Sequence, residues 1–93
     1  MQKLSTTEIE ENLEKVNNWN FDGAVIEKDF TFKDFDEAME AINKIANEAR
    51  IQNHHPEWTN VYSKLKIKLS THDVSGISNK DFELAKAIDL IVK

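Results

Sequence analysis

The chain contains no cysteine, one proline and two glycines among its 93 residues. The absence of cysteine excludes disulfides, thiolate catalysis and zinc sites with sulfur ligands, and it fits a reducing cytoplasm. So few prolines and glycines leave little room for long flexible linkers. No apolar run approaches the length that spans a bilayer, and the first residues lack the apolar core of a signal peptide. We therefore expect one small domain over residues 1–93, in the cytoplasm, with no membrane partner.

Basic residues are also in the minority. The chain has 12 Lys and Arg against 17 Asp and Glu, so its net charge is −5 and we expect no nucleic acid partner. Hydrophobic residues make up 40% of the chain, which is too many for a disordered protein. A domain of this size has a thin core, and self-association would add to its stability. We therefore expect a homo-oligomer.

Three segments have the signals of helices. Residues 5–18 begin with a Ser-x-x-Glu pattern, which predicts a capping box. Residues 33–52 place apolar side chains three and four positions apart, which predicts the longest helix. Ser78 precedes a third apolar stripe with Asp81 three residues on, and we interpret it as an N-cap. The stripe of the longest helix consists of Phe35, Met39, Ile42, Ala46 and Ala49, widened by Ala38 and Ile45.

The remaining segments have the signals of strands. Apolar and polar residues alternate within residues 18–32 on both sides of Asp22-Gly23, which predicts a β-hairpin. Residues 64–70 alternate leucine or isoleucine with lysine or serine, which predicts a strand with one solvated face, and residues 58–62 are its expected partner. The predicted order is therefore αββαββα. We expect an α+β fold, with a single four-stranded antiparallel sheet and helices packed on one face.

All three histidines lie in two short segments. His54 and His55 follow the longest helix and precede Pro56, which disfavours a helical residue before it and is expected to end that helix. His72 stands at the end of the lysine-rich strand, at the expected rim of the sheet. Imidazoles exchange protons near neutral pH because their unperturbed pKa is about 6.5. The histidines therefore predict a proton-transfer site that needs no metal and no nucleophile.

Other interpretations of these polar and aromatic residues stay open. Asp73 or Asp81 could fix a histidine tautomer, although Asp81 could instead serve only as a helix cap. A histidine at a turn is ordinarily just a polar residue on the surface, and Trp58 and Tyr62 are ordinarily aromatics of the core or of an interface. A three-histidine zinc site is the main alternative to a proton-transfer site. Its spacing lacks the helical HExxH pattern, however, and two adjacent residues are poorly placed to bind the same metal ion.

The segment "HHPEWTNVYSKLKIKLSTHD", residues 54–73, closely resembles the core of the pterin-4a-carbinolamine dehydratases. The family pattern is His-His-Pro, an aromatic residue six positions past the proline, a histidine ten further on, and then an aspartate. The matching residues here are His54, His55, Pro56, Tyr62, His72 and Asp81, while Trp58 and residues 69–73 match as well. One position departs from the pattern, since Arg50 stands four residues before His54 where the family usually carries Glu or one of a limited set. An arginine there implies a changed charge near His54.

The resemblance implies a dehydratase that converts 4a-hydroxytetrahydrobiopterin to quinonoid dihydrobiopterin and water, without a cofactor or a metal. It also implies a link to the aromatic amino acid hydroxylases, which form this carbinolamine as a by-product. By resemblance, His54 and His72 are the acid and base, and His55 positions the pterin. Asp81 is expected to contact these histidines without touching the substrate. The expected pterin-binding residues are Asn53, His54, His55, Pro56, Trp58, Ser70, Thr71, His72 and Asp73. A homodimer or homotetramer is implied too.

Two alternative functions follow from the same resemblance. Some members of this family act as dimerisation cofactors for a transcription regulator, and the acidic surface of this chain would permit a protein partner. The chain could also be a catalytically silent pterin-binding module, an alternative that rests on Arg50.

Overall fold

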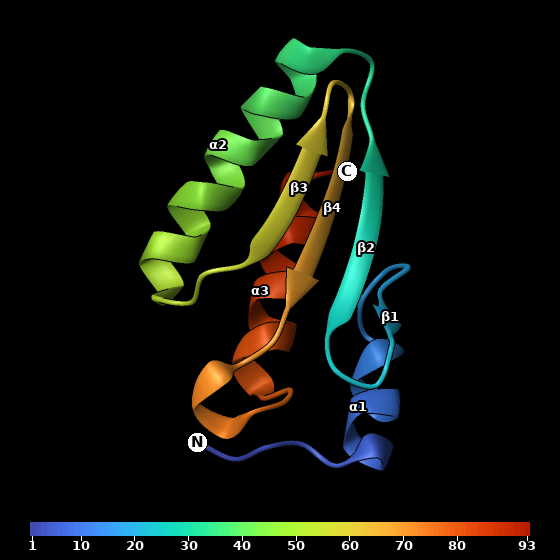
Figure 1. Ribbon diagram of the computed structural model, residues 1–93, viewed down its shortest axis with the longest axis vertical. Helices are drawn as coiled ribbons and strands as arrows, with labels where there is room; N and C mark the ends of the chain where they lie inside the picture. Colours follow the sequence, from blue (N-terminus) through green and yellow to red (C-terminus); the bar gives the residue numbers. More distant parts are fainter.

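The computed structural model describes residues 1–93 and contains three α-helices and one four-stranded antiparallel sheet (Figure 1). The element order is αββαββα and the strand order in the sheet is β1-β2-β4-β3, so the predicted α+β fold is confirmed. None of the helices is long and apolar enough to cross a membrane. The elements are α1 (Thr6–Leu13), β1 (Asn20–Phe21), β2 (Ile26–Thr31), α2 (Phe35–Gln52), β3 (Glu57–Val61), β4 (Lys64–Leu69), the short 3-10 helix η1 (His72–Val74) and α3 (Asn79–Ile91).

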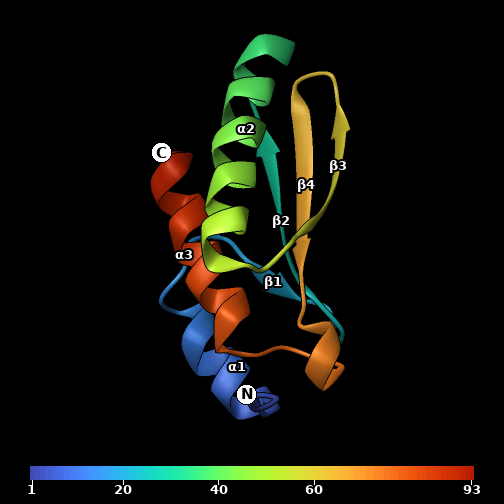
Figure 2. The ribbon, with the colours of Figure 1, turned by 90° about the vertical axis from the view of Figure 1, so that its left-hand side faces the viewer.

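The helices cover one face of the sheet, as predicted (Figure 2). Leu65, Ile67 and Leu69 of β4 point to that face and are fully buried, because successive side chains of a strand alternate between its two faces. The lysines between them lie on the open face, where Lys66 pairs with Asp29 of β2 at 3.3 Å. The alternating pattern of residues 64–70 thus orients β4 and makes it the centre of the core.

The predicted helix starts are confirmed, whereas one helix end and one apolar position differ from prediction. Helix α1 ends at Leu13 rather than near residue 18, because the chain turns there and Asn18 is left-handed with φ 61°. Phe35, predicted to lie in the apolar stripe of α2, is 44% exposed. The first turn of α2, where Phe35 lies, extends beyond the end of α3 (Figure 2). The buried residues of α2 are Ala38, Ala41, Ile42, Ile45 and Ala49.

A buried ion pair ties α3 to the sheet and to the segment before β1. Asp89 of α3 accepts hydrogen bonds from Lys28 Nζ at 2.8 Å, the backbone N–H of Asn17 at 2.9 Å and Trp19 Nε1 at 3.0 Å. The Asp89 side chain is only 7% exposed, so all three bonds lie in a region of low dielectric. They fix the hairpin against α3 from the far end of the helix.

The turn between β1 and β2 depends on Asp22. Its Oδ1 accepts hydrogen bonds from the backbone N–H groups of Ala24 and Val25, both at 2.8 Å. Gly23 has φ 102°, a conformation that favours glycine. The bonds from Val25 and Ala24, with a contribution from the charge of Lys68, lower the pKa of Asp22 below its ordinary value. The charged form of Asp22 therefore stabilises the turn.

We predict that Asp22→Asn makes unfolding less dependent on pH in the acid range. The native pKa of Asp22 is lowered, so its contribution to stability is present above the unfolded pKa of about 3.9 and is lost as the pH falls through the native pKa. Wild type should therefore lose more free energy of unfolding than Asp22→Asn between pH 5 and pH 3. Urea unfolding followed by tryptophan fluorescence measures both slopes, and equal slopes would contradict the prediction.

Candidate active site

The end of α2 determines the position of His54. Asn53 follows the helix in the left-handed conformation with φ 51°, and the N–H of His54 donates to the carbonyl of Ala49 at 3.0 Å. This is the bond of a Schellman motif, which reverses the chain direction at a helix end. The sequence predicted a helix that ends at residue 52, before Pro56, and this end is confirmed, with Asn53 as the residue that ends it. The reversal brings His54 to the start of α3.

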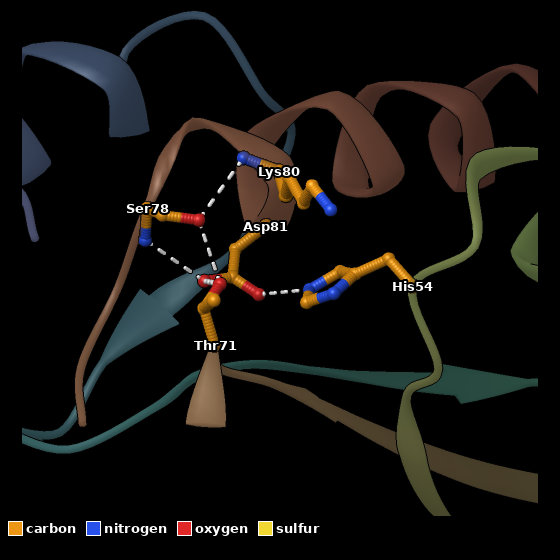
Figure 3. Close-up of polar contacts among 5 residues, drawn as sticks. All are labelled: His54, Thr71, Ser78, Lys80 and Asp81. Carbon is orange, nitrogen blue, oxygen red and sulfur yellow. Dashed lines mark hydrogen bonds and ion pairs between the residues drawn. The ribbon is translucent and has the colours of Figure 1, made fainter. Parts of the chain in front are cut away.

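His54 is hydrogen-bonded to a buried carboxylate, that of Asp81. His54 Nε2 lies 2.6 Å from Asp81 Oδ1, and Asp81 Oδ2 accepts from Thr71 Oγ1 at 2.8 Å and from the N–H of Ser78 at 3.0 Å (Figure 3). Asp81 is 0% exposed and Thr71 is 4% exposed. The carboxylate therefore joins the ends of α2 and β4 to the first turn of α3, and it has a donor on each oxygen.

In each hydrogen bond of this network, the donor and the acceptor can be assigned. Thr71 Oγ1 and Ser78 Oγ are 2.6 Å apart, and Ser78 Oγ accepts from the N–H of Lys80 at 3.2 Å. A hydroxyl carries one proton, and an ionised carboxylate only accepts. Because Thr71 donates to Asp81, Ser78 must donate to Thr71. By the same reasoning His54 donates from Nε2, which leaves its Nδ1 free to exchange a proton with a ligand.

His72 is presented by a closed loop. The N–H of Thr71 donates to the carbonyl of Gly76 at 2.7 Å, and Ser75 takes the left-handed conformation with φ 51° to complete the loop. His72 is the first residue of η1 within this loop, and its side chain is exposed. The loop follows β4 directly, so Thr71 is anchored to Asp81 while His72, its neighbour, faces solvent.

These elements surround a polar cavity of about 350 Å³. It brings together all three histidines and most of the residues predicted to bind a pterin. Asn53 and Asp73 lie at its wall, and His55 is exposed beside the largely buried His54. The lining residues are Met1, Asn53, His54, His55, Ser70, Thr71, His72, Asp73 and Lys80.

Several residues of the predicted pattern lie outside the cavity lining, among them Asp81 and Leu69, which are buried behind it. Trp58 is half-buried and packs against the hydrophobic core, and Pro56 only shapes the chain after the histidines. Tyr62 is 65% exposed at the turn between β3 and β4. Arg50 is exposed at the end of α2, forms no ion pair and does not line the cavity.

Two lining residues were not foreseen from the sequence. Lys80 lies in the first turn of α3, next to Asp81, and its position follows once Asp81 is placed against His54. It is half-buried and forms no ion pair. Met1 reaches the cavity only through the path of the N-terminal segment, for which the sequence carries no signal. Nowhere in the chain do three His, Asp or Glu side chains lie close enough together to hold a metal ion.

Comparisons with known proteins agree with the resemblance seen in residues 54–73. The family model for pterin 4 alpha carbinolamine dehydratase matches residues 2–91. Relatives that carry this family's name include a protein of Christiangramia forsetii, 46% identical over 93 residues that cover 100% of this chain and 96% of that one. Another, from Sulfurisphaera tokodaii, is 47% identical over 89 residues that cover 96% of each chain.

The fold agrees as well. The crystal structure of a protein from Brucella melitensis, described as a transcriptional coactivator/pterin dehydratase, matches with a TM-score of 0.94 and 32% sequence identity. The match covers 98% of this chain and 99% of that chain. The family model matches nearly the full length of this chain. Together with these similarities, this match shows that the chain belongs to the pterin-4a-carbinolamine dehydratase family.

Proposed function

We propose that this protein dehydrates 4a-hydroxytetrahydrobiopterin, or a related 4a-hydroxytetrahydropterin, to the quinonoid dihydropterin. The observation that carries the proposal is that His54, which lines a polar cavity together with His55 and His72, is hydrogen-bonded to the buried Asp81 behind it. Membership of the dehydratase family supports the same reaction.

The reaction requires one proton donor and one proton acceptor. The C4a–O bond breaks as an acid protonates the hydroxyl, which leaves as water. A base removes the proton from N5, and the electron pair of that N–H bond forms the C4a=N5 double bond. Imidazoles perform both steps near neutral pH, and positioned groups of this kind contribute about 10²–10⁴ in rate.

The geometry supports separate roles for the three histidines. We assign His54 and His72 as the acid and base, because one is fixed by Asp81 and the other stands at the start of a closed loop. His55 is exposed at the same cavity and positions the ring. The hydrogen-bonding edge of a pterin, which carries an amide and an amine, suits the polar wall that includes Asn53 and Asp73.

We predict that His54→Ala and His72→Ala each lower kcat for dehydration by roughly 10²-fold, the contribution expected of a positioned acid or base. His55→Ala should mainly raise KM. The assay follows the ultraviolet absorbance of enzymatically generated 4a-hydroxytetrahydropterin after treatment with a chelator. Asn43→Ala, exposed on α2 outside the cavity, is the control and should match wild type. A wild-type rate equal to the uncatalysed background would overturn the proposal.

We predict that Thr71→Val changes the tautomer of the His54 imidazole, whereas Thr71→Ser keeps the wild-type tautomer. Valine keeps the shape but removes the donor to Asp81 and the acceptor of the Ser78 proton, which costs about 1–3 kcal/mol of folding free energy. Nitrogen-15 NMR of the imidazoles should show Nε2-protonated His54 in wild type and in Thr71→Ser, and a changed tautomer mixture in Thr71→Val. Identical spectra in all three proteins would show that Thr71 does not control the tautomer.

We also propose that the protein is a homo-oligomer in which β3 pairs with β3 of a second copy. β3 is an edge strand of five residues with no neighbour on one side, a ready template for strand pairing. Val61 at its end is 67% exposed and Tyr62 beside it is 65% exposed. The short β1 at the opposite edge, with two residues, is a poorer template.

We predict that Val61→Lys dissociates the oligomer at micromolar concentration, because it places a charge at an apolar interface without disturbing the fold. Leu90→Lys is the matched control, since Leu90 is 68% exposed on α3, on the helical side of the molecule. Native mass measurement distinguishes the two surfaces. Dissociation by Leu90→Lys alone would place the interface on the helices, and a monomeric wild type would exclude self-association.

A further inference from the structure

A second cavity of about 500 Å³ adjoins the histidine cavity. Ser70, Thr71 and His72 line both cavities, so the two cavities share the segment that carries His72. The second cavity lies between this loop, the turn before β2 and the N-terminal segment that leads into α1. Its other lining residues are Lys3, Leu4, Thr6, Ile9, Phe21, Gly23, Ala24, Val25, Ser75, Gly76 and Ile77.

The second cavity differs from the first in its chemistry. Its apolar lining includes the buried Leu4, Ile9 and Ile77 and the half-buried Phe21 and Val25. The polar residues of the lining are Lys3, His72 and several serines and threonines. Such a surface suits a short carbon chain that carries hydroxyl groups, whereas the histidine cavity suits a polar ring.

The N-terminal segment is held in place as part of this cavity. The N–H of Leu4 donates to the carbonyl of Ile77 at 2.7 Å. The side chain of Lys3 lies across Gly76, where an added Cβ would stand 2.6 Å from Lys3 Cε. A larger residue at position 76 would displace only the flexible end of the Lys3 side chain. Lys3 forms no ion pair, so its ammonium group is available to a ligand.

We propose that the second cavity binds the substituent at C6 of the pterin, and that it selects substrates with a short hydroxylated chain. This inference rests on the proposed dehydration. In a pterin, C6 is bonded to N5, the atom that loses its proton. A substituent on C6 must therefore lie close to whichever histidine acts at N5. His72 is the histidine that lines both cavities, so a substituent next to the atom on which His72 acts would lie beside the second cavity.

The test compares two substrates that differ only at C6, the 6-methyl and the 6-(1,2-dihydroxypropyl) forms of 4a-hydroxytetrahydropterin. Ala24→Phe fills the second cavity from an exposed position on its wall and leaves the histidines intact. It should lower kcat/KM for the dihydroxypropyl substrate about tenfold, the low end of what a lost pocket for one small group changes, and leave the methyl substrate within about twofold. Asn43→Phe, which introduces the same residue at an exposed position outside both cavities, is the matched control and should leave both substrates unchanged.

Equal loss for both substrates, or no loss for either, would overturn the subsite. The proposed function fails separately, if wild type does not accelerate either substrate. In that event calorimetric titration with the unreactive 7,8-dihydropterins carrying the same two substituents repeats the comparison without turnover. Tighter binding of the dihydroxypropyl form that Ala24→Phe abolishes would support the subsite, and equal affinities would overturn it.

Discussion

The carboxylate of Asp81 is the group on which the arrangement of the site depends. Burying an ionised carboxylate costs several kcal/mol unless hydrogen bonds and an opposite charge or dipole offset the lost hydration. Here the donors come from His54, Thr71 and Ser78, and the start of α3 contributes the positive end of its dipole. Each donor belongs to a different part of the chain. The need to satisfy one buried charge therefore brings the end of α2, the end of β4 and the beginning of α3 to a single point.

The same interactions explain why the site is rigid on one side and open on the other. Thr71 is buried and held by side-chain and backbone bonds, whereas the next residue, His72, is exposed. His54 is held at Nε2, while His55 after it is exposed at the cavity. Each anchored residue is thus followed by one that can meet a ligand. A substrate bound there would meet imidazoles whose backbone is fixed, which reduces the ordering needed to reach a reactive geometry.

Much of the fold was predictable because its signals are local. The alternation in residues 64–70 predicted β4 and its buried face, and the capping pattern predicted the start of α3 at Ser78. The errors concern features set by distant neighbours. Phe35 has the spacing of the buried stripe, yet it is 44% exposed, because spacing alone does not say how far the layer against the helix extends. The end of α2 at Gln52, before Pro56, agrees with the prediction, and the left-handed Asn53 is the residue that ends the helix.

The site shows the same division between local and distant information. The sequence left two roles open for Asp81, helix cap or partner of a histidine, and the structure shows both at once, because each oxygen of the carboxylate serves a different role. This double role also limits the choice at position 78. Aspartate caps helices about as well as serine, but at Ser78 it would place a second carboxylate within hydrogen-bond distance of Thr71 and remove the donor that Thr71 Oγ1 requires. A hydroxyl alone both accepts from the N–H of Lys80 and donates to Thr71. Several residue types could cap α3, but fewer of them could also donate a hydrogen bond to Thr71. The hydrogen bonds of the site therefore restrict the residue that begins α3.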